Sequence, residues 1–198
     1  MGLISNGSTI FDNGSMASGF GGNMVFISKA TASSSASIEF TLGDYKEYQF
    51  YFVDIHPQND NVDFQFNLST DGGSNYNVTK TTTFFRAYHG DAGGEYTAFN
   101  YEPTRDLAQS SSFATITFSI GNDNDETGAG TLQIFNPSSS VFVKHFIART
   151  SATIFVYDEA DDQYTAGYGN TTSPINSIKF QMSSGNIDAG SILMFGIN

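Results

Sequence analysis

Short runs in which apolar and polar residues alternate, separated by turn-forming residues, restrict the fold of this chain more than any other feature. The clearest run is Val62 to Ser69, whose apolar side chains are Val62, Phe64, Phe66 and Leu68. A period of two places successive side chains on opposite faces of a β-strand. No stretch of the 198-residue chain has convincing helical periodicity. The pattern therefore predicts an all-β protein.

Similar runs follow one another from Met24 almost to the last residue. Their ordinary length and the Gly, Asn, Asp and Pro between them predict a jelly-roll-like antiparallel β-sandwich of about ten to twelve strands, formed as one domain by residues 24–198. Besides Val62–Ser69, strands are expected at Met24–Ser28, Ser37–Leu42, Tyr48–Ile55, Tyr76–Phe85, Phe113–Ile120, Gly130–Phe135, Val141–Arg149, Ala152–Tyr157, Tyr164–Tyr168, Ile175–Met182 and Ser191–Ile197.

Residues 1–23 differ from the rest, because Gly, Ser and Asn surround isolated apolar residues that follow neither period. This composition predicts an extended N-terminal arm. The apolar residues of the arm need cover, either from their own domain or from a neighbouring subunit. As an assembly arm it would make subunit contacts through Leu3, Ile4, Ile10, Phe11 and Phe20.

Charge and composition exclude several classes of partner. The formal net charge is −12, and the eight basic residues are scattered singly. Phosphate backbones and anionic membranes both require clustered cations, so we expect no nucleic-acid and no membrane partner. The absence of cysteine excludes zinc ribbons and disulfide scaffolds. No apolar run approaches the roughly 20 residues of a membrane span, and residues 1–20 lack the basic start of a signal peptide.

The sequence contains no recognisable catalytic or metal-binding motif. Its three histidines are far apart, and there is no Gly-x-Ser-x-Gly nucleophile motif. We therefore expect a non-enzymatic protein without catalytic residues, metal ligands or cofactor. Asp123, Asp125, Thr127 and Gly128 match the opening of a calcium loop, but the twelfth position is Ile134 rather than an acid. Calcium is thus only a minor alternative.

Four carboxylates, Asp158, Glu159, Asp161 and Asp162, fall within five residues. Such crowding favours a solvated loop, with a cation site as the minor alternative.

The segment from Ser69 to Tyr76 resembles the Asp-box hairpin of sialidases and other β-proteins, although Asn75 stands where that motif has threonine. The resemblance implies that the Asp71 side chain accepts backbone hydrogen bonds within the turn. A structural role, without catalysis, is expected for this segment.

A long, weakly patterned segment runs from Tyr88 to Gln109 and is expected to be a loop. Aromatic rings in such a loop stack on sugars, or pack the loop against its own domain or a subunit interface. Both alternatives stay open for Tyr88, Tyr96, Phe99 and Tyr101.

Six segments of turn-forming residues follow one another along the chain: Met1–Gly7, Asp54–Pro57, Leu68–Tyr76, Leu132–Ser138, Asn170–Ser173 and Ser183–Ile187. Taken in order, these segments resemble a family of virion proteins of marine bacteriophages. The resemblance implies a β-sandwich structural component on the capsid surface or in the tail and its fibres, without catalytic residues.

The first expectation is accordingly a non-enzymatic protein that decorates or cements the outer capsid surface through arm-mediated subunit contacts. It would be assembled in the host cytoplasm as a homo-oligomer, with a trimer as one arrangement, and its partners would be other virion proteins. The alternative is a tail-fibre or other tail-associated module that binds host surface polysaccharide. A polysaccharide-degrading enzyme ranks third, for want of a recognisable acid and base.

Overall fold

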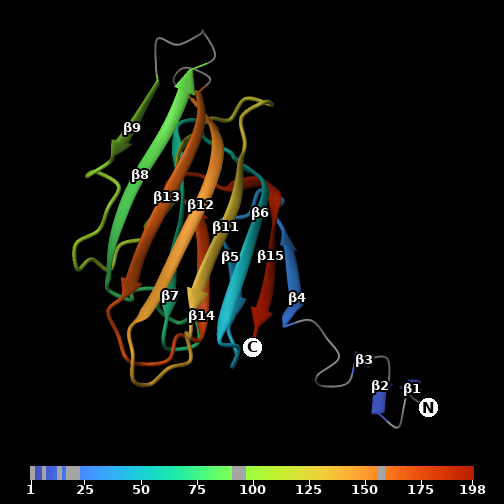
Figure 1. Ribbon diagram of the computed structural model, residues 1–198. Helices are drawn as coiled ribbons and strands as arrows, with labels where there is room; N and C mark the ends of the chain where they lie inside the picture. Colours follow the sequence, from blue (N-terminus) through green and yellow to red (C-terminus); the bar gives the residue numbers. More distant parts are fainter. Residues whose placement is uncertain (1–2, 6–7, 13–14, 17–22, 91–96, 156–158) are drawn as a thin grey trace.

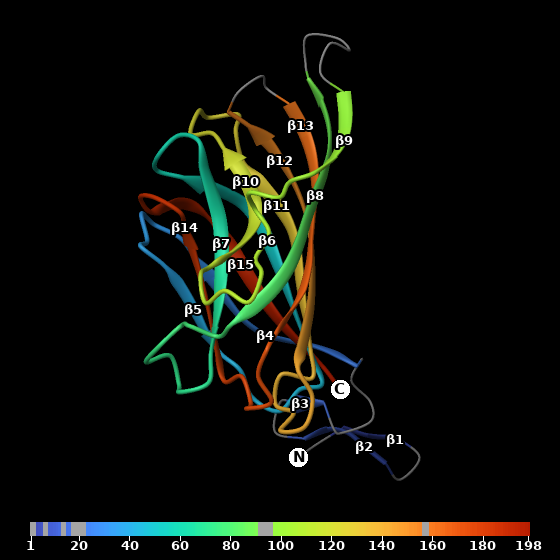
Figure 2. The ribbon, with the colours of Figure 1, turned by 90° about the vertical axis from the view of Figure 1, so that its left-hand side faces the viewer.

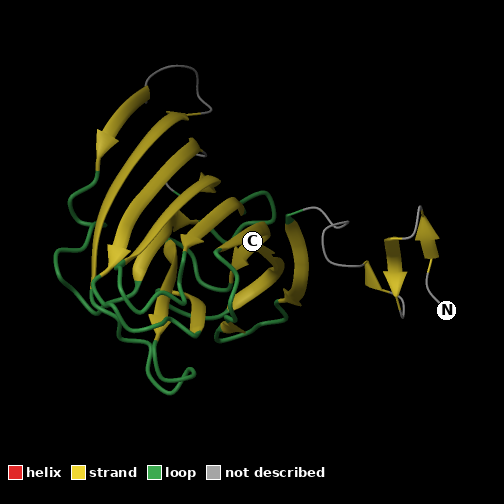
Figure 3. Cartoon of the chain, turned by 60° about the horizontal axis from the view of Figure 1, so that its bottom comes forward, coloured by secondary structure: helices red, strands yellow, loops and turns green. Residues whose placement is uncertain are grey.

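The computed structural model describes residues 3–5, 8–12, 15–16, 23–90, 97–155 and 159–198. Within these ranges every helix or strand assigned is a β-strand (Figure 3). Twelve strands form one antiparallel sheet that branches at a single strand and folds into two facing layers (Figures 1 and 2). The predicted all-β antiparallel class is therefore confirmed. Among the residues described, no helix is long and apolar enough to cross a membrane.

The larger layer contains eight strands. In spatial order they are β4 (Met24–Thr31), β15 (Ile187–Ile197), β6 (Glu47–Pro57), β11 (Gly128–Phe135), β12 (Lys144–Ile154), β13 (Glu159–Gly169), β8 (Lys80–Gly90) and β9 (Thr97–Tyr101). β4 and β9 are thus the two edges of this layer.

The smaller layer contains four strands and lies behind the larger one. Its order is β10 (Ala114–Ile120), β7 (Val62–Ser69), β14 (Ser177–Met182) and β5 (Ile38–Thr41). The layers join where Ile120 of β10 pairs with Ile154 of β12, so the sheet curls back on itself as in a partly closed barrel. The jelly-roll connectivity expected from the sequence stays a prediction.

Phenylalanine rings from both layers form the centre of the core. The Phe180 ring of β14 lies with its centroid 5.3 Å from that of Phe50, 5.4 Å from that of Phe52 and 5.8 Å from that of Phe64. All four side chains are buried. These positions alternate along β6 and β7 as the sequence pattern predicts, and burying large aromatic surfaces is the main source of stability in such a core.

Several strands are longer than expected. The two strands predicted at Val141–Arg149 and Ala152–Tyr157 are one strand, β12, which passes through the polar residues Thr150 and Ser151. The Thr150 hydroxyl donates a hydrogen bond of 2.9 Å to the Ile116 carbonyl, so this polar side chain is accommodated inside the protein. The hydrogen bond to Ile116, which is distant in the sequence, thus allows the strand to continue through residues that the sequence pattern treats as a break.

The Asp71 turn has the predicted hydrogen bonds but not the predicted partners. Asp71 accepts from the Asn75 side chain at 2.7 Å and backbone at 2.9 Å, and from the Ser69 hydroxyl at 2.7 Å. These bonds lower the pKa of Asp71 to about 2. However, β7 pairs with β10 and β14, whereas β8 pairs with β13 and β9. The turn therefore begins a crossing between layers instead of closing a hairpin.

Part of the expected arm contains regular structure. β1 (Leu3–Ser5), β2 (Ser8–Asp12) and β3 (Ser15–Met16) form a small antiparallel sheet whose strands pair only with one another among the strands described. Pairing between neighbouring segments needs only short loops, whose closure costs little entropy. The sequence pattern, which lacks clean alternation, did not indicate these strands.

Two lysine side chains are fully buried. Lys80 donates hydrogen bonds to the Asn67 side-chain oxygen at 2.5 Å and to the Val78 carbonyl at 2.8 Å. Burial lowers the pKa of Lys80 to about 7. Lys144 donates to the Phe142 carbonyl at 2.6 Å. Both lysines therefore satisfy backbone or amide oxygens and hold segments together within the protein.

Candidate docking surface

Exposed apolar side chains occur on several strands of the larger layer, and all of these strands except β9 pack residues of their other face on the core. The outer face of such a layer is normally polar, and a concentration of exposed apolar groups usually marks a contact surface. The large apolar side chains exposed on strands of this layer include Met24, Phe26, Val53, Phe99, Tyr101 and Ile147.

A row of side chains in mutual contact crosses four neighbouring strands of this face. Strand register aligns Arg149 of β12 with Tyr164 of β13, and Tyr164 with Phe85 of β8. The Tyr164 and Phe85 rings stack with centroids 4.8 Å apart, and the Arg149 guanidinium lies 5.1 Å from the Tyr164 centroid. Phe99 of β9 lies 5.3 Å from Phe85. We call Arg149, Tyr164, Phe85 and Phe99 the aromatic ridge.

The charge on the ridge is balanced locally. Arg149 donates two hydrogen bonds to the Asp162 carboxylate, at 2.9 and 2.8 Å, and the Tyr164 hydroxyl donates a third at 2.9 Å. The pKa of Asp162 is lowered, chiefly by Arg149, and that of Arg149 is raised by Asp162. A bidentate pair of this kind has a fixed geometry. The ridge thus presents apolar rings without an unpaired charge.

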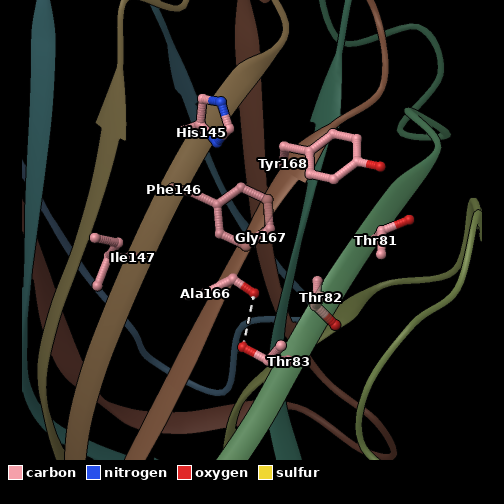
Figure 4. A pocket seen from close by; sticks show the side chains of 9 residues that line it. All are labelled: Thr81, Thr82, Thr83, His145, Phe146, Ile147, Ala166, Gly167 and Tyr168. Carbon is pink, nitrogen blue, oxygen red and sulfur yellow. Dashed lines mark hydrogen bonds between the residues drawn. The ribbon is translucent and has the colours of Figure 1, made fainter.

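A shallow apolar hollow of about 480 Å³ lies on one side of the ridge. Figure 4 shows the side chains that line it. Ala166 and Gly167 leave the space open, and Ile147, a residue with 49% of its surface exposed, forms part of the lining. A Cβ at Gly167 would lie 2.4 Å from the Thr81 carbonyl oxygen, so the close packing of β13 on β8 requires glycine there. We call this space the apolar hollow; its lining residues are Thr81, Thr82, Thr83, His145, Phe146, Ile147, Ala166, Gly167 and Tyr168.

A second hollow, of about 320 Å³, lies on the other side of the ridge. Ala87 and Ala160 contribute to it in the same way that Ala166 contributes to the first, because small side chains stand next to large ones along β8 and β13. The surface therefore alternates between depressions and the ridge along the strands.

An ionic cluster on the inner face of β8 and β13 supports this surface. Arg86 donates to Glu102 at 3.0 Å, to Glu159 at 3.3 Å and to Asp161 at 2.5 Å. Its guanidinium also stacks on Tyr88, 4.1 Å from the ring centroid. Because Glu102 follows β9 directly, the cluster links β9 to the two strands beside it.

The expectation of a solvated acidic loop was wrong for three of its four residues. Glu159, Asp161 and Asp162 belong to strand β13, and Glu159 and Asp161 are buried. Their partner, Arg86, lies more than 70 residues away in the sequence. Asp162 points to the opposite face and pairs with Arg149. Asp158 lies outside the described residues.

Asp161 gives this cluster a distinct pH dependence. Burial raises the pKa of Asp161 to about 6, above the usual value of 3.8. The folded state therefore binds this proton more tightly, and the resulting stabilisation is present below about pH 4 and lost as the pH rises through 6. Asp161→Asn should remove up to about 3 kcal/mol of the stability difference between pH 4 and pH 7, at about 1.4 kcal/mol per pKa unit. Urea unfolding of both proteins at the two pH values measures it; an unchanged pH profile in the variant would contradict this role.

The structure separates the aromatic residues singled out in the sequence. Phe99 and Tyr101 lie on the edge strand β9, with 70% and 50% of their surfaces exposed. Tyr88 lies on the same face of β8 as Arg86 and stacks on it, away from the ridge. Tyr96 lies outside the described residues. The predicted loop from Tyr88 to Gln109 thus contains the end of β8 and all of β9, which pair as neighbours.

For the arm, the structure describes only the backbone of Leu3, Ile4, Ile10 and Phe11, within β1 and β2. Phe20 lies outside the described residues. Sequence reasoning missed Phe85, Tyr164, Ile147 and Arg149, whose outward alternation within their strands was the available signal. Their grouping depends on strand pairing, which that alternation does not specify.

The turn considered for calcium is held by a hydrogen bond within the turn and by a contact with β6. The Asp123 backbone N–H donates to the Glu126 carboxylate at 2.9 Å, and the Asp123 carbonyl contacts a His56 ring nitrogen at 3.2 Å. Within the described part of the chain, no group of three or more His, Cys, Asp or Glu residues is arranged to hold a metal ion.

Comparisons with protein-family models, with curated proteins and with solved structures find no match to this chain.

Proposed function

We propose that this protein is a non-enzymatic structural component of a bacteriophage particle that decorates or cements the outer capsid surface. The observation that carries the proposal is the outer face of the larger layer, which carries both exposed apolar side chains and the apolar hollow, with the exposed Ile147 in the lining of the hollow. Protein interfaces combine such apolar centres with a polar rim. The turn motifs that resemble, in the same order, those of marine phage virion proteins support the proposal that this protein belongs to a phage particle.

A tail-associated module that binds host polysaccharide is the second candidate. The exposed rings of Phe99 and Tyr101 favour it, because sugars stack on free aromatic faces. Against it, the Tyr164 ring has Phe85 on one face and Arg149 on the other. In the apolar hollow, the hydroxyls of Thr81 and Tyr168 already accept hydrogen bonds from Gln109. The Thr83 hydroxyl donates to the Ala166 carbonyl, so few polar groups of the hollow are free for sugar hydroxyls. Capsid attachment therefore has more support from the geometry.

The position and copy number of the protein in intact particles test both proposals. Electron cryomicroscopy with quantitative mass spectrometry should find it on the capsid exterior in copies that follow the capsid symmetry. A location in the tail, with only a few copies per particle, would contradict capsid decoration and favour the polysaccharide module. Absence from purified particles would contradict both.

A single substitution should connect the outer face with attachment. Ile147→Asp places a charge beside the apolar hollow, and we expect it to reduce incorporation into particles by about tenfold or more, as for the loss of an interface anchor. Val141→Asp is the matched control, because Val141 is 66% exposed but precedes β12 and lies outside the hollow. Circular dichroism should show that both variants fold. Equal incorporation of the two variants would contradict attachment through this face.

A further inference from the structure

We propose that the side chains of Lys80 and Asn67 become joined by an amide bond, which links the two layers of the sheet covalently. Asn67 lies on β7 of the smaller layer, and Lys80 begins β8 of the larger layer. The two residues are 13 positions apart in the sequence, and the crossing that begins at the Asp71 turn connects them. The inference goes beyond the proposed function, because it concerns the domain itself and not the surface to which the domain attaches.

The first argument is the contact between the two side chains. Lys80 Nζ lies 2.5 Å from Asn67 Oδ1, and both residues are fully buried. Because a C=O bond is about 1.2 Å long, the carbonyl carbon Cγ of Asn67 is about 3–3.5 Å from Nζ. A nucleophile held at this separation is in position to attack.

The second argument is that Lys80 is buried without a counter-charge. Its other hydrogen-bond acceptor is the Val78 carbonyl, at 2.8 Å, and no carboxylate in the described part of the chain forms an ion pair with it. Burial therefore lowers the pKa of Lys80 to about 7. About half of the molecules carry the neutral amine at pH 7, and the neutral amine is the nucleophilic form of lysine.

The third argument is the fixed orientation of the Asn67 amide. Its Nδ2 donates hydrogen bonds to the Tyr76 carbonyl at 2.7 Å and to the Ser111 carbonyl at 2.9 Å. The Leu68 backbone N–H donates to Oδ1 at 2.8 Å. This N–H would stabilise the negative charge that develops on Oδ1 when Nζ attacks Cγ.

The reaction exchanges one amide for another. The neutral Lys80 Nζ attacks Asn67 Cγ, so that the Nζ–Cγ bond forms and the Cγ–Nδ2 bond breaks. A proton moves from Nζ to Nδ2, which leaves as ammonia, and no further reagent is consumed. The product has no ionisable group, so it removes the cost of burying an amine. It also closes a loop in the unfolded chain, as a disulfide does.

Lys144 is an internal comparison for this chemistry. It is also fully buried, but its Nζ donates to the backbone carbonyls of Phe142 at 2.6 Å and Thr171 at 3.3 Å. Neither bond involves a side-chain amide, and attack on a backbone carbonyl would cut the chain. Lys144 should therefore stay unmodified.

Intact mass spectrometry of the denatured full-length protein tests the proposal. We expect a mass lower than that of the sequence by one ammonia. A protease that cuts before aspartate separates Asn67 from Lys80 at Asp71, so the bond should appear as two peptides joined through these side chains. Native protein that keeps the mass of its sequence after incubation at pH 8 would overturn the proposal. So would a loss of ammonia without the joined peptides.

Three variants assign the loss of ammonia to this pair. Lys80→Met removes the amine and Asn67→Ala removes the amide, so both should keep the mass of their sequences. Lys144→Met is the matched control and should lose ammonia as the unmodified protein does. Ring closure at the two Asn-Gly pairs within residues 1–23 also releases ammonia, but it would persist in Lys80→Met and joins no peptides. If a variant fails to fold, the joined peptides of the unmodified protein still decide.

The pH dependence of the reaction gives a second readout. Full-length chain from cell-free translation is exchanged into buffers of different pH, and the loss of ammonia is followed by mass. Because only the neutral amine attacks, the rate should rise about tenfold from pH 6 to a plateau above pH 8. A rate that continues to rise tenfold per pH unit up to pH 10 would indicate an ordinary exposed lysine and would contradict attack by Lys80.

Discussion

Arg86→Leu is expected to lower the free energy of unfolding by about 3–5 kcal/mol at pH 7, the usual cost of removing one partner from a buried ion pair. Glu102, Glu159 and Asp161 all bond to Arg86, and the last two side chains are at most 4% exposed. Leucine would leave their charges uncompensated. The loss should shrink on acidification to pH 4, because burial raises the pKa of Asp161 to about 6 and its charge is then removed by protonation. Urea unfolding at pH 7 and pH 4 measures both effects.

Arg149→Leu is the matched control for this prediction. Arg149 also pairs with a carboxylate on the larger layer, but its side chain is 63% exposed. Exposed pairs contribute little because water screens them. The control should therefore lower the free energy of unfolding much less than Arg86→Leu. Equal losses in the two variants would contradict the prediction that burial makes the Arg86 cluster important for stability.

Phe180→Ala should lower the free energy of unfolding by about 3–5 kcal/mol, as is typical when a buried phenylalanine is truncated. Phe180 contacts rings of β6 and β7, so its removal leaves a cavity that neither layer can fill alone. Phe99→Ala provides the comparison, because Phe99 is 70% exposed and should cost less than about 1 kcal/mol. Urea unfolding at pH 7 tests both variants, and similar midpoints would contradict the central place of Phe180 in the core.

Sequence pattern predicts local features of this protein well. The alternation in Val62–Ser69 identifies β7 and its buried rings, and the Asp71 turn forms the hydrogen bonds that its residues indicate. Both depend on residues within a few positions of each other. The partner strands do not, and for that reason the turn proves to link two layers where a hairpin was expected.

The candidate site illustrates the same limit. Glu159 and Asp161 read as solvated because nothing nearby in the sequence neutralises them, yet strand pairing brings Arg86 beside them. The aromatic ridge likewise assembles from four strands whose order in the layer differs from their order in the sequence. The sequence identifies Phe99 and Tyr101 on β9 as candidates. It does not identify Phe85 and Tyr164 as their neighbours, because that grouping depends on the register between strands.

Because β9 is an edge strand, it should open in thermal fluctuations more readily than the strands that carry the core. β9 hydrogen-bonds to one neighbour, β8, and its residues are mostly exposed, so the free energy needed to open it locally is small. β6, β7 and β14 carry the core rings and should open only when the whole domain unfolds. Backbone amides of β9 would accordingly exchange their hydrogens for deuterium first. The rings of Phe99 and Tyr101 are thus carried by a strand that can adjust to a partner without disturbing the core.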